Sequence, residues 1–414
     1  MTFPNLPLTL SSKGKPLDLF FFAGESSGDL HGERLLTALH TLDPKLTIGG
    51  IGGPKMRALG MHAFLPMEEF QVMGFLDVLP ALPRLIRHFH AIKRYLLTSP
   101  PKAIVLIDYP GFNLRLARAL QKKHCPAQKI QYVCPSVWAW GKRRIPQISR
   151  SFDHLLTLLP FEPELFHDEP IQATYTGHPA IERIAHHTYD RDWRASYHLP
   201  LRTPLLALFP GSRAKEVQRN FPLQIKAACQ LIREFAPLRL AVSCAHPNLL
   251  PLLRPHLPPF ASLIDQRHSY ELMRDAQLAI ATSGTITLEL ALHCVPTIVT
   301  YAITSLDTFL ARHLLRIRLP YYALPNLIAQ APLFPEFFGP HLTPAAIKSA
   351  ARAYLMSECK RQSCITACEG LKTSLGKEQA SLSAARLILS TLSPSFQAQK
   401  NPPLREDIRV EFPS

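Results

Sequence analysis

The chain has 414 residues, of which 46 are Lys or Arg and 31 are Asp or Glu, so its formal charge is +15. Apolar residues make up 47% and charged residues 19%, a globular composition that excludes wholesale disorder. The length suits two α/β domains better than one. The positive balance favours an anionic partner, and nucleic acid, a phosphorylated metabolite and an acidic membrane surface all fit.

The sequence predicts no membrane span and no cleaved leader. It lacks any stretch of about 18 consecutive apolar residues, the length of a spanning helix. Residues 1–16 lack the charged start, apolar middle and small-residue cleavage site of a signal peptide. The eight cysteines form no Cys-x-x-Cys pair, which predicts reduced thiols. We therefore expect a cytosolic chain.

Short β-rich runs alternate with amphipathic segments through the first half of the chain. The predicted strands are Leu17–Ala23, Leu46–Ile51, Ala103–Asp108, Ile130–Cys134, His154–Leu159 and Ala173–Thr176. Helical patterns lie between them, at Arg34–His40, Pro83–Leu97 and Leu114–Lys123. Strands that alternate with helices predict right-handed crossovers and a largely parallel sheet.

The pattern pauses over residues 180–204, which are polar and carry no predicted strand, and then restarts. The second set of strands is Leu205–Phe209, Leu238–Cys244, Ala261–Ile264, Leu278–Thr282 and Thr297–Tyr301. We therefore expect two doubly wound, Rossmann-like domains that face a cleft. The predicted partition is an extension at 1–16, domains at 17–185 and 200–365, a helical segment at 366–392 and a loose tail at 393–414.

Two Gly/Ser turns follow strands of the second set, at positions where helix N-termini offer free N–H groups to anions. In Gly211-Ser212-Arg213 the backbone allows close approach and the guanidinium can bind phosphate through two N–H groups. Ser283-Gly284-Thr285 follows a later strand, with Glu289 one helical turn on. The two turns together favour a nucleotide diphosphate. Each turn alone is also explained by ordinary turn chemistry, which uses the same residues.

Other site motifs are absent or weak. No Walker A or HExxH sequence occurs, and GGIGGP at residues 49–54 does not form a GxGxxG that opens a helix. No metal site is predicted, because the cysteines at 359, 364 and 368 have no histidine nearby. Residues 24–28 match the GxSxG nucleophile elbow, with Ser26 as nucleophile. This elbow follows the first strand, whereas such hydrolases need an earlier strand, so a hydrolase is disfavoured.

Ten segments together resemble the lipid-A-disaccharide synthases, which are GT-B glycosyltransferases of bacterial outer-membrane biosynthesis. They occur in order: AGESSGDLHG (23–32), GIGGPKM (50–56), VMGFLDVL (72–79), IDYPGFN (107–113), YVCPSVWAW (132–140), LPFEPELF (159–166), TGHP (176–179), FPGSRAKEV (209–217), TSGTITLE (282–289) and LPNLIA (324–329).

The resemblance implies that UDP-2,3-diacylglucosamine gives its sugar to the 6-hydroxyl of 2,3-diacylglucosamine 1-phosphate. The products are the β(1→6)-linked disaccharide 1-phosphate and UDP. It implies an inverting displacement without metal or cofactor, and an N-terminal domain that binds the acceptor and faces the membrane. It also implies C-terminal helices that pack back on that domain, a Gram-negative source and a place at the cytoplasmic face of the inner membrane. A homodimer has precedent in the family.

An inverting displacement needs a general base. Asp108 ends a predicted strand and matches the Asp of the family's ID-x-P-x-FN motif; the less favoured alternative is that it only caps the next helix. Glu25 and Asp29, on the first loop, are alternatives that could instead hold acceptor hydroxyls. His31 and His178 are weaker candidates, because the chain has 18 histidines.

The departing UDP needs positive charge and N–H groups. We predict that Arg213 binds the pyrophosphate and Glu289 the ribose, and that Asn326 lies near the nucleotide unless it is only a turn residue. The complete predicted nucleotide-sugar site is Ser212, Arg213, Ser283, Gly284, Thr285, Glu289 and Asn326. Trp138 and Trp140 are predicted to form core or cleft wall. The basic run Lys142, Arg143 and Arg144 fits either the acceptor phosphate or a solvated face.

Both substrates are acylated, so the resemblance implies contact with a membrane. Residues 75–97 combine apolar side chains with basic ones that can meet anionic headgroups. The predicted acyl or membrane contacts are Leu76, Val78, Leu79, Leu82, Leu85 and Ile86, and the basic residues are Arg84, Arg87, Lys93 and Arg94. Burial of this face against the sheet is the alternative.

Two positions depart from the family pattern. Cys134 replaces a usual Ser, and Gly111 replaces a usual acid, which weakens the assignment of Asp108.

Two other functions fit part of the sequence. Another UDP-sugar transferase, such as the lipid-linked peptidoglycan transferase, is disfavoured by AGESSGD and PSVWAW. A nucleic-acid-binding protein is disfavoured because the basic residues are scattered without interleaved aromatics.

Overall fold

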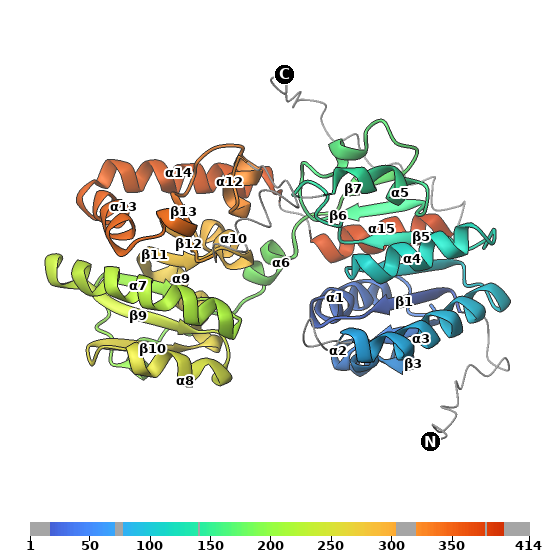
Figure 1. Ribbon diagram of the computed structural model, residues 1–414, viewed down its shortest axis with the longest axis horizontal. Coiled ribbons are helices and arrows are strands. Elements are labelled where there is room, and N and C mark those ends of the chain that lie inside the picture. The colour runs from blue at the N-terminus through green and yellow to red at the C-terminus, as the bar shows by residue number, and fades with distance from the viewer. Residues whose placement is uncertain (1–16, 71–77, 140, 304–319, 377–378, 393–414) are drawn as a thin grey trace.

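The computed structural model describes residues 17–70, 78–139, 141–303, 320–376 and 379–392. The extension at 1–16, the tail at 393–414 and the predicted site residues Leu76 and Trp140 lie outside the described residues. Two parallel sheets, each flanked by helices, form two domains joined by α6 (Figure 1). The two doubly wound domains predicted from the sequence are confirmed.

The N-terminal sheet has seven parallel strands among the described residues, in the order β3-β2-β1-β4-β5-β6-β7. They are β1 (Leu19–Ala23), β2 (Ile48–Gly52), β3 (His62–Pro66), β4 (Ala103–Ile107), β5 (Gln128–Tyr132), β6 (His154–Thr157) and β7 (Gln172–Tyr175). The neighbours β1 and β4 are buried along their whole length, as continuous apolar runs in a central parallel sheet require. The strand order reverses between them, which makes this the switch point where such sheets bind ligands.

The C-terminal sheet has six parallel strands among the described residues, in the order β10-β9-β8-β11-β12-β13. They are β8 (Leu205–Phe209), β9 (Arg239–Cys244), β10 (Ala261–Asp265), β11 (Ala276–Thr282), β12 (Thr297–Tyr301) and β13 (Glu336–Phe338). Its switch point lies between β8 and β11, where the two predicted Gly/Ser turns begin.

Helices cover both sheets. The helices up to and including the connection between the two domains are α1 (Ser26–Leu42), α2 (Pro54–Ala58), α3 (Val78–Thr98), α4 (Pro110–Gln121), α5 (Ile145–Ser149) and α6 (Pro179–Ala185). Those after it are α7 (Ala214–Glu234), α8 (Leu250–Leu253), α9 (Ser269–Asp275), α10 (Thr285–Leu292), α12 (Leu324–Ala329), α13 (Pro344–Met356), α14 (Glu358–Ser374) and α15 (Ala380–Leu392). None of the helices in the described part of the chain is both long enough and apolar enough to cross a bilayer.

One C-terminal helix, α15, returns to the N-terminal domain. Its residues Ala384, Ala385, Ile388 and Leu389 share a buried cluster with Leu35, Leu36 and Leu39 of α1. The preceding helix, α14, stays on the C-terminal domain, where Cys368 and Leu371 join that core. The predicted return of the C-terminal helices is therefore made by α15, which lies across the N-terminal sheet (Figure 1).

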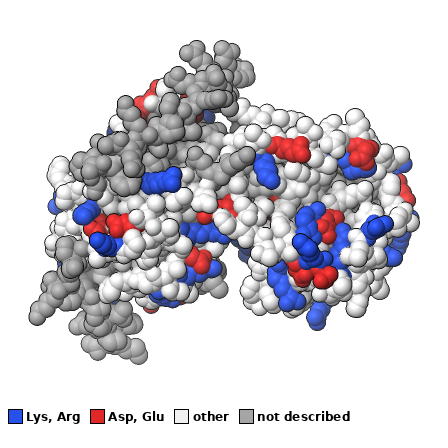
Figure 2. Space-filling view, turned by 180° about the vertical axis from the view of Figure 1, so that it is seen from behind, with Lys and Arg blue, Asp and Glu red and all other residues white. Residues whose placement is uncertain are grey.

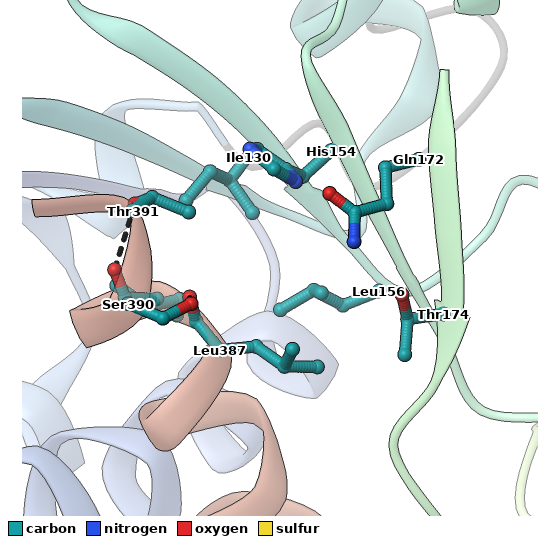
Figure 3. A pocket seen from close by; sticks show the side chains of 9 residues that line it. Ile130, His154, Leu156, Gln172, Thr174, Leu387, Ser390 and Thr391 are labelled. Atoms are coloured by element: carbon teal, nitrogen blue, oxygen red, sulfur yellow. Dashed lines mark hydrogen bonds between the residues drawn. The ribbon is translucent and has the colours of Figure 1, made fainter. Parts of the chain in front are cut away.

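A small cavity of about 30 Å³ lies between α15 and strands β5 to β7 (Figure 3). Polar side chains such as His154, Gln172 and Ser390 line it together with Leu156 and Leu387. It has room for water and is far too small for a nucleotide sugar.

Candidate active site

The loops after β1 and β4 bring two carboxylates together at the N-terminal switch point. Glu25 is the N-cap of α1, and the Ser27 Oγ in the first turn donates to Asp108 Oδ2 at 2.8 Å. Partial burial raises the pKa of Glu25, the negative charge of Asp108 raises it further, and Arg213 of the other domain opposes the shift. The first loop, Asp108 and Arg213 therefore belong to one electrostatic environment.

The backbone at Asp108 is strained. Asp108 and the following Tyr109 both adopt left-handed conformations, with φ of 49° and 45°, which residues other than glycine seldom do. The Asp108 carbonyl accepts hydrogen bonds from the side-chain amides of Asn113 and Gln131, and its N–H donates to the Tyr132 carbonyl at 2.9 Å. These bonds hold a turn that presents the Asp108 carboxylate to the first loop, and such strain concentrates at functional sites.

Asp29 lies nearby but has a different use. It is 3% exposed, and its two oxygens accept hydrogen bonds from the backbone N–H groups of Lys55 and Met56, both at 3.1 Å. A Cβ on Gly53 would lie 2.4 Å from the Asp29 carboxylate, so a larger residue there would displace that carboxylate. Asp29 thus caps α2, and its predicted catalytic role stays a prediction that these contacts do not support.

The two candidate histidines are uncharged at neutral pH. Burial lowers the pKa of His31 to about 4, although Asp108 opposes the shift, and burial lowers the pKa of His178 to about 3. The His178 Nδ1 accepts from the Ala180 N–H at 3.1 Å and so caps α6. The His31 ring lies edge-on to Tyr132, with 6.1 Å between the ring centroids.

The turn after β8 already holds an anion of the chain itself. The Glu216 carboxylate accepts from the backbone N–H groups of Ser212 and Arg213 at 3.3 Å and pairs with the Arg213 guanidinium at 2.9 Å. Gly211 has a φ of +122° there, and a Cβ on it would lie 2.9 Å from Glu216. The turn therefore has the geometry of an oxyanion site, and Arg213, 82% exposed, is accessible to a phosphate.

The turn after β11 is open on its outer side. Gly284 is the N-cap of α10, and a Cβ added to it would meet no atom within 4 Å. Ser283 is held by a bond from its N–H to the Thr300 carbonyl, and Thr287 bonds to the Gly284 carbonyl through its hydroxyl at 2.7 Å. Thr285 is exposed beside Gly284. A ligand can therefore approach this backbone closely.

Glu289 does not stand alone on α10. Its Oε1 accepts from Arg183 Nη2 at 2.6 Å and from the Tyr270 hydroxyl at 3.0 Å. Sequence reasoning missed both partners, because they lie far from Glu289 in the chain and carry no motif of their own.

Asn326 is buried, and its amide is occupied. It donates to the Phe334 carbonyl at 2.7 Å and to Glu336 Oε1 at 2.8 Å, and it accepts from the Phe334 N–H at 2.8 Å. These bonds fasten the start of α12 to β13. A direct contact with nucleotide stays a prediction.

The PSVWAW loop covers a buried carboxyl that the sequence did not single out. Glu162 accepts from the N–H groups of Leu158 and Leu159 at 3.2 and 3.0 Å, and burial raises its pKa to about 7. The Trp138 ring lies edge-on to Phe161 and is half-buried, which is compatible with a wall position.

The predicted membrane face of α3 is exposed only in part. Leu82 and Ile86 are 40% and 48% exposed, whereas Leu85 packs against the core. Val78 and Leu79 form the start of α3. Among the basic residues, Arg84 lies 3.7 Å from Glu69.

Charge is mixed on the face of the molecule that Figure 2 shows. Lys or Arg and Asp or Glu lie side by side over the face shown in Figure 2, without one continuous basic patch on that face. Of the predicted basic run, Lys142 and Arg143 are exposed and Arg144 is half-buried. No group of three or more His, Cys, Asp or Glu in the described ranges is arranged to hold a metal ion.

Comparison with known proteins gives one family. The family model described as "Lipid-A-disaccharide synthetase" matches residues 19–389. A lipid-A-disaccharide synthase of Chlamydia trachomatis serovar D is 40% identical over 324 residues, which are 77% of this chain and 53% of that protein. One of Coxiella burnetii is 33% identical over 371 residues, which are 89% of this chain and 97% of that protein. The chain thus spans about half the length of the chlamydial relative.

Solved structures share the fold. Methanocaldococcus jannaschii UDP-GlcNAc 2-epimerase in complex with UDP-GlcNAc and UDP has a TM-score of 0.56 at 12% identity, covering 90% of this chain and 99% of that chain. CalG4, the calicheamicin glycosyltransferase, has a TM-score of 0.54 at 14% identity, covering 94% and 100%. Such identities establish the GT-B architecture and nothing finer. The family match is far longer than either domain, and on that ground the chain belongs to the lipid-A-disaccharide synthase family.

Proposed function

We propose that this chain is an inverting glycosyltransferase that moves 2,3-diacylglucosamine from its UDP derivative to the 6-hydroxyl of 2,3-diacylglucosamine 1-phosphate. The observation that carries the proposal is the 2.8 Å contact that joins the first loop to Asp108, with Arg213 of the other domain near enough for its charge to act on Glu25. A base for the acceptor and a cation for the departing diphosphate are thereby supplied from opposite sides of one site.

Asp108 is the proposed general base. The acceptor 6-oxygen attacks the anomeric carbon, Asp108 takes its proton, and the bond between that carbon and the UDP oxygen breaks with its electron pair leaving on UDP. Ser27 fixes one Asp108 oxygen through its 2.8 Å hydrogen bond and leaves the other for the acceptor. Glu25, whose pKa is raised beside Asp108, is suited to hold an acceptor hydroxyl.

The turns of the C-terminal domain are the proposed UDP site. Arg213 and the N–H groups of its turn receive the pyrophosphate in place of the Glu216 carboxylate, which occupies them here. Ser283, Gly284 and Thr285 line the neighbouring turn, and Glu289 faces the ribose. The leaving group gains negative charge as the bond breaks, so Arg213 and the N–H groups of the turns stabilise it most strongly in the transition state.

The exposed apolar residues of α3 support contact with acylated substrates at a membrane surface. Leu82 and Ile86 project from a helix that also carries Arg87 and Arg94, a combination typical of helices that lie on anionic lipid. We propose peripheral association with the cytoplasmic face of the inner membrane. A homodimer stays a prediction.

The test is release of UDP from UDP-2,3-diacylglucosamine with and without the monophosphate acceptor. We expect release that depends on acceptor, with a disaccharide product, and a fall of about 10² to 10⁴ in kcat for Asp108→Asn with UDP binding retained. Asp168→Asn, at an exposed turn, is the control and is expected to match the wild type. Full activity in Asp108→Asn excludes Asp108 as the base, and UDP release by the wild type that is the same with and without acceptor excludes the transfer.

A further inference from the structure

The segment that joins the two domains reaches into the proposed nucleotide site. The connecting helix α6 presents two charged neighbours, Glu182 and Arg183, in different directions, since successive helical residues point about 100° apart. Glu182 turns to the return helix, where its Oε2 accepts from the Ser381 N–H at 3.3 Å and hydroxyl at 2.9 Å. Arg183 turns to the C-terminal domain and meets Glu289 on α10.

The contact between Arg183 and Glu289 is largely shielded from water. The side chains are 22% and 12% exposed, and Nη2 lies 2.6 Å from Oε1. The Arg183 Nε also donates to the Tyr270 hydroxyl at 3.3 Å, and that hydroxyl donates to the same Glu289 oxygen at 3.0 Å. An ion pair in such surroundings is screened weakly, and loss of one partner leaves a buried charge uncompensated.

The two bonds that reach the Glu289 carboxylate, from Arg183 and from Tyr270, end on the same oxygen. Among the described residues, the hydrogen bonds and the ion pair of this carboxylate fall on Oε1. A carboxylate has about four acceptor positions, so Oε2 keeps its capacity for a hydroxyl of a ligand. Arg183 also offsets the repulsion between Glu289 and the two negative phosphates of UDP.

We propose that Arg183 is a positioning residue for UDP, supplied to the nucleotide site by the connecting helix. It fixes the Glu289 carboxylate with Oε2 toward the ribose and neutralises its charge. The C-terminal domain alone therefore holds an incomplete UDP site. This inference rests on the proposed role of Glu289 in binding ribose.

The experiment measures the Kd of UDP by calorimetry, and KM and kcat with UDP-2,3-diacylglucosamine, for full-length variants. We expect Arg183→Gln to weaken UDP about tenfold and to raise KM with little change in kcat, and Arg183→Lys to recover part of the loss. In a Glu289→Gln background, Arg183→Gln should have no further effect on the Kd.

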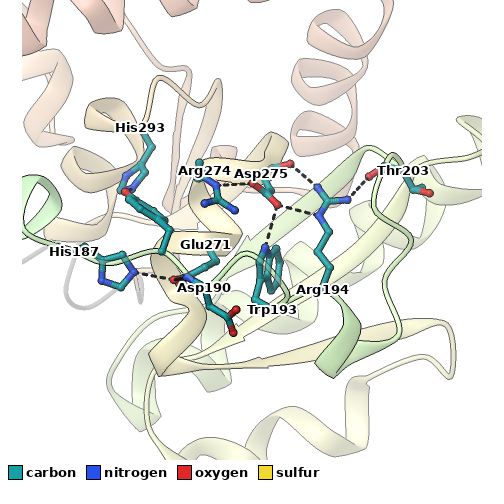
Figure 4. Close-up of polar contacts among 10 residues, drawn as sticks. His187, Asp190, Trp193, Arg194, Thr203, Glu271, Arg274, Asp275 and His293 are labelled. Carbon is teal, nitrogen blue, oxygen red and sulfur yellow. Dashed lines mark hydrogen bonds and ion pairs between the residues drawn. The ribbon is translucent and has the colours of Figure 1, made fainter.

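Arg194→Gln is the matched control. Like Arg183, Arg194 forms a shielded ion pair with a carboxylate of the C-terminal domain: its Nε lies 2.9 Å from Asp275 Oδ2 (Figure 4). Arg194 also donates to the Thr203 carbonyl at 3.0 Å. We expect this variant to lower the Tm and leave the Kd of UDP unchanged. A weakening of UDP equal to that in Arg183→Gln would show a general loss of structure and overturn the inference.

Two outcomes separate the inference from the role on which it rests. If Glu289→Gln leaves the Kd of UDP unchanged, Glu289 does not bind ribose and both assignments fall. If Glu289→Gln weakens UDP but Arg183→Gln binds it as the wild type does, or more tightly, only the role of Arg183 is overturned.

Discussion

Glu162 offers a test of the structure that needs no substrate. Its carboxyl is 3% exposed under the PSVWAW loop, and burial raises its pKa from 4.5 to about 7. The folded state therefore binds this proton more tightly than the unfolded state. Its contribution to stability is complete below about pH 4.5 and is lost as the pH rises through about 7.

The size of the effect follows from the two pKa values. One pKa unit corresponds to about 1.4 kcal/mol, so the free energy of unfolding should fall by about 3 kcal/mol over this range because of Glu162 alone. His31 and His178 act in the opposite direction, since their pKa values are lowered by burial and the unfolded state binds their protons more tightly. The pH profile of the wild type alone would mix these contributions.

The perturbation that isolates Glu162 is Glu162→Gln, which keeps the shape of the side chain and removes the titration. We would measure urea unfolding of the wild type and the variant at several pH values from about 5 to 8. The wild type should lose stability relative to the variant as the pH rises. Glu164→Gln, at an exposed position two residues on, should show a constant difference from the wild type. A constant difference for Glu162→Gln as well would mean that Glu162 is ionised in the fold, and the reasoning from burial would be wrong.

Three further outcomes are expected. Gly111→Asp should raise the free energy of unfolding by about 1 kcal/mol in urea titrations, because Gly111 faces open space in the first turn of α4; a loss would contradict this. Leu82→Ser with Ile86→Ser should reduce sedimentation with anionic lipid vesicles and leave the Tm unchanged, and unchanged sedimentation would exclude this face. Asp108→Asn should keep or raise the Tm, since Asn tolerates the left-handed backbone and removes repulsion with Glu25; a fall of several degrees would refute that balance.

The strands that could be predicted are those with a strong apolar signal. Leu205–Phe209 is predicted with the bounds that β8 has, because a central parallel strand is apolar on both faces. No comparable apolar signal marks β3, which is mostly exposed at a sheet edge, or β13, which has three residues. The predicted start of a helix at Pro83 was late, since α3 begins at Val78 and accommodates the proline inside it.

The same distinction applies to the site residues: some are placed by the local sequence, and others are held by contacts with residues far away in the chain. The turns at Ser212 and Ser283 follow strands directly, so their place at the ends of the strands is a local property. One partner of Glu289 is Arg183, which is 106 residues away and belongs to the polar connection between the domains. The bonds from Asp29 to the start of α2 cross 26 and 27 residues. A single sequence shows which side chains carry charge and leaves open which of them face each other.

The carboxylates of the described site differ in what holds them, and that difference separates structural from chemical roles. Asp29 and Glu216 receive backbone N–H groups and so stabilise the loops they close. Asp108 instead receives a hydroxyl from Ser27 and stands on a backbone whose left-handed conformation costs about 1–3 kcal/mol, which only the surrounding hydrogen bonds maintain. A capping carboxylate lowers the energy of its loop, whereas the backbone conformation at Asp108 raises it. If Asp108 is the proposed base, the scaffold supports it at the expense of local stability, which is the arrangement expected where a side chain must meet a substrate.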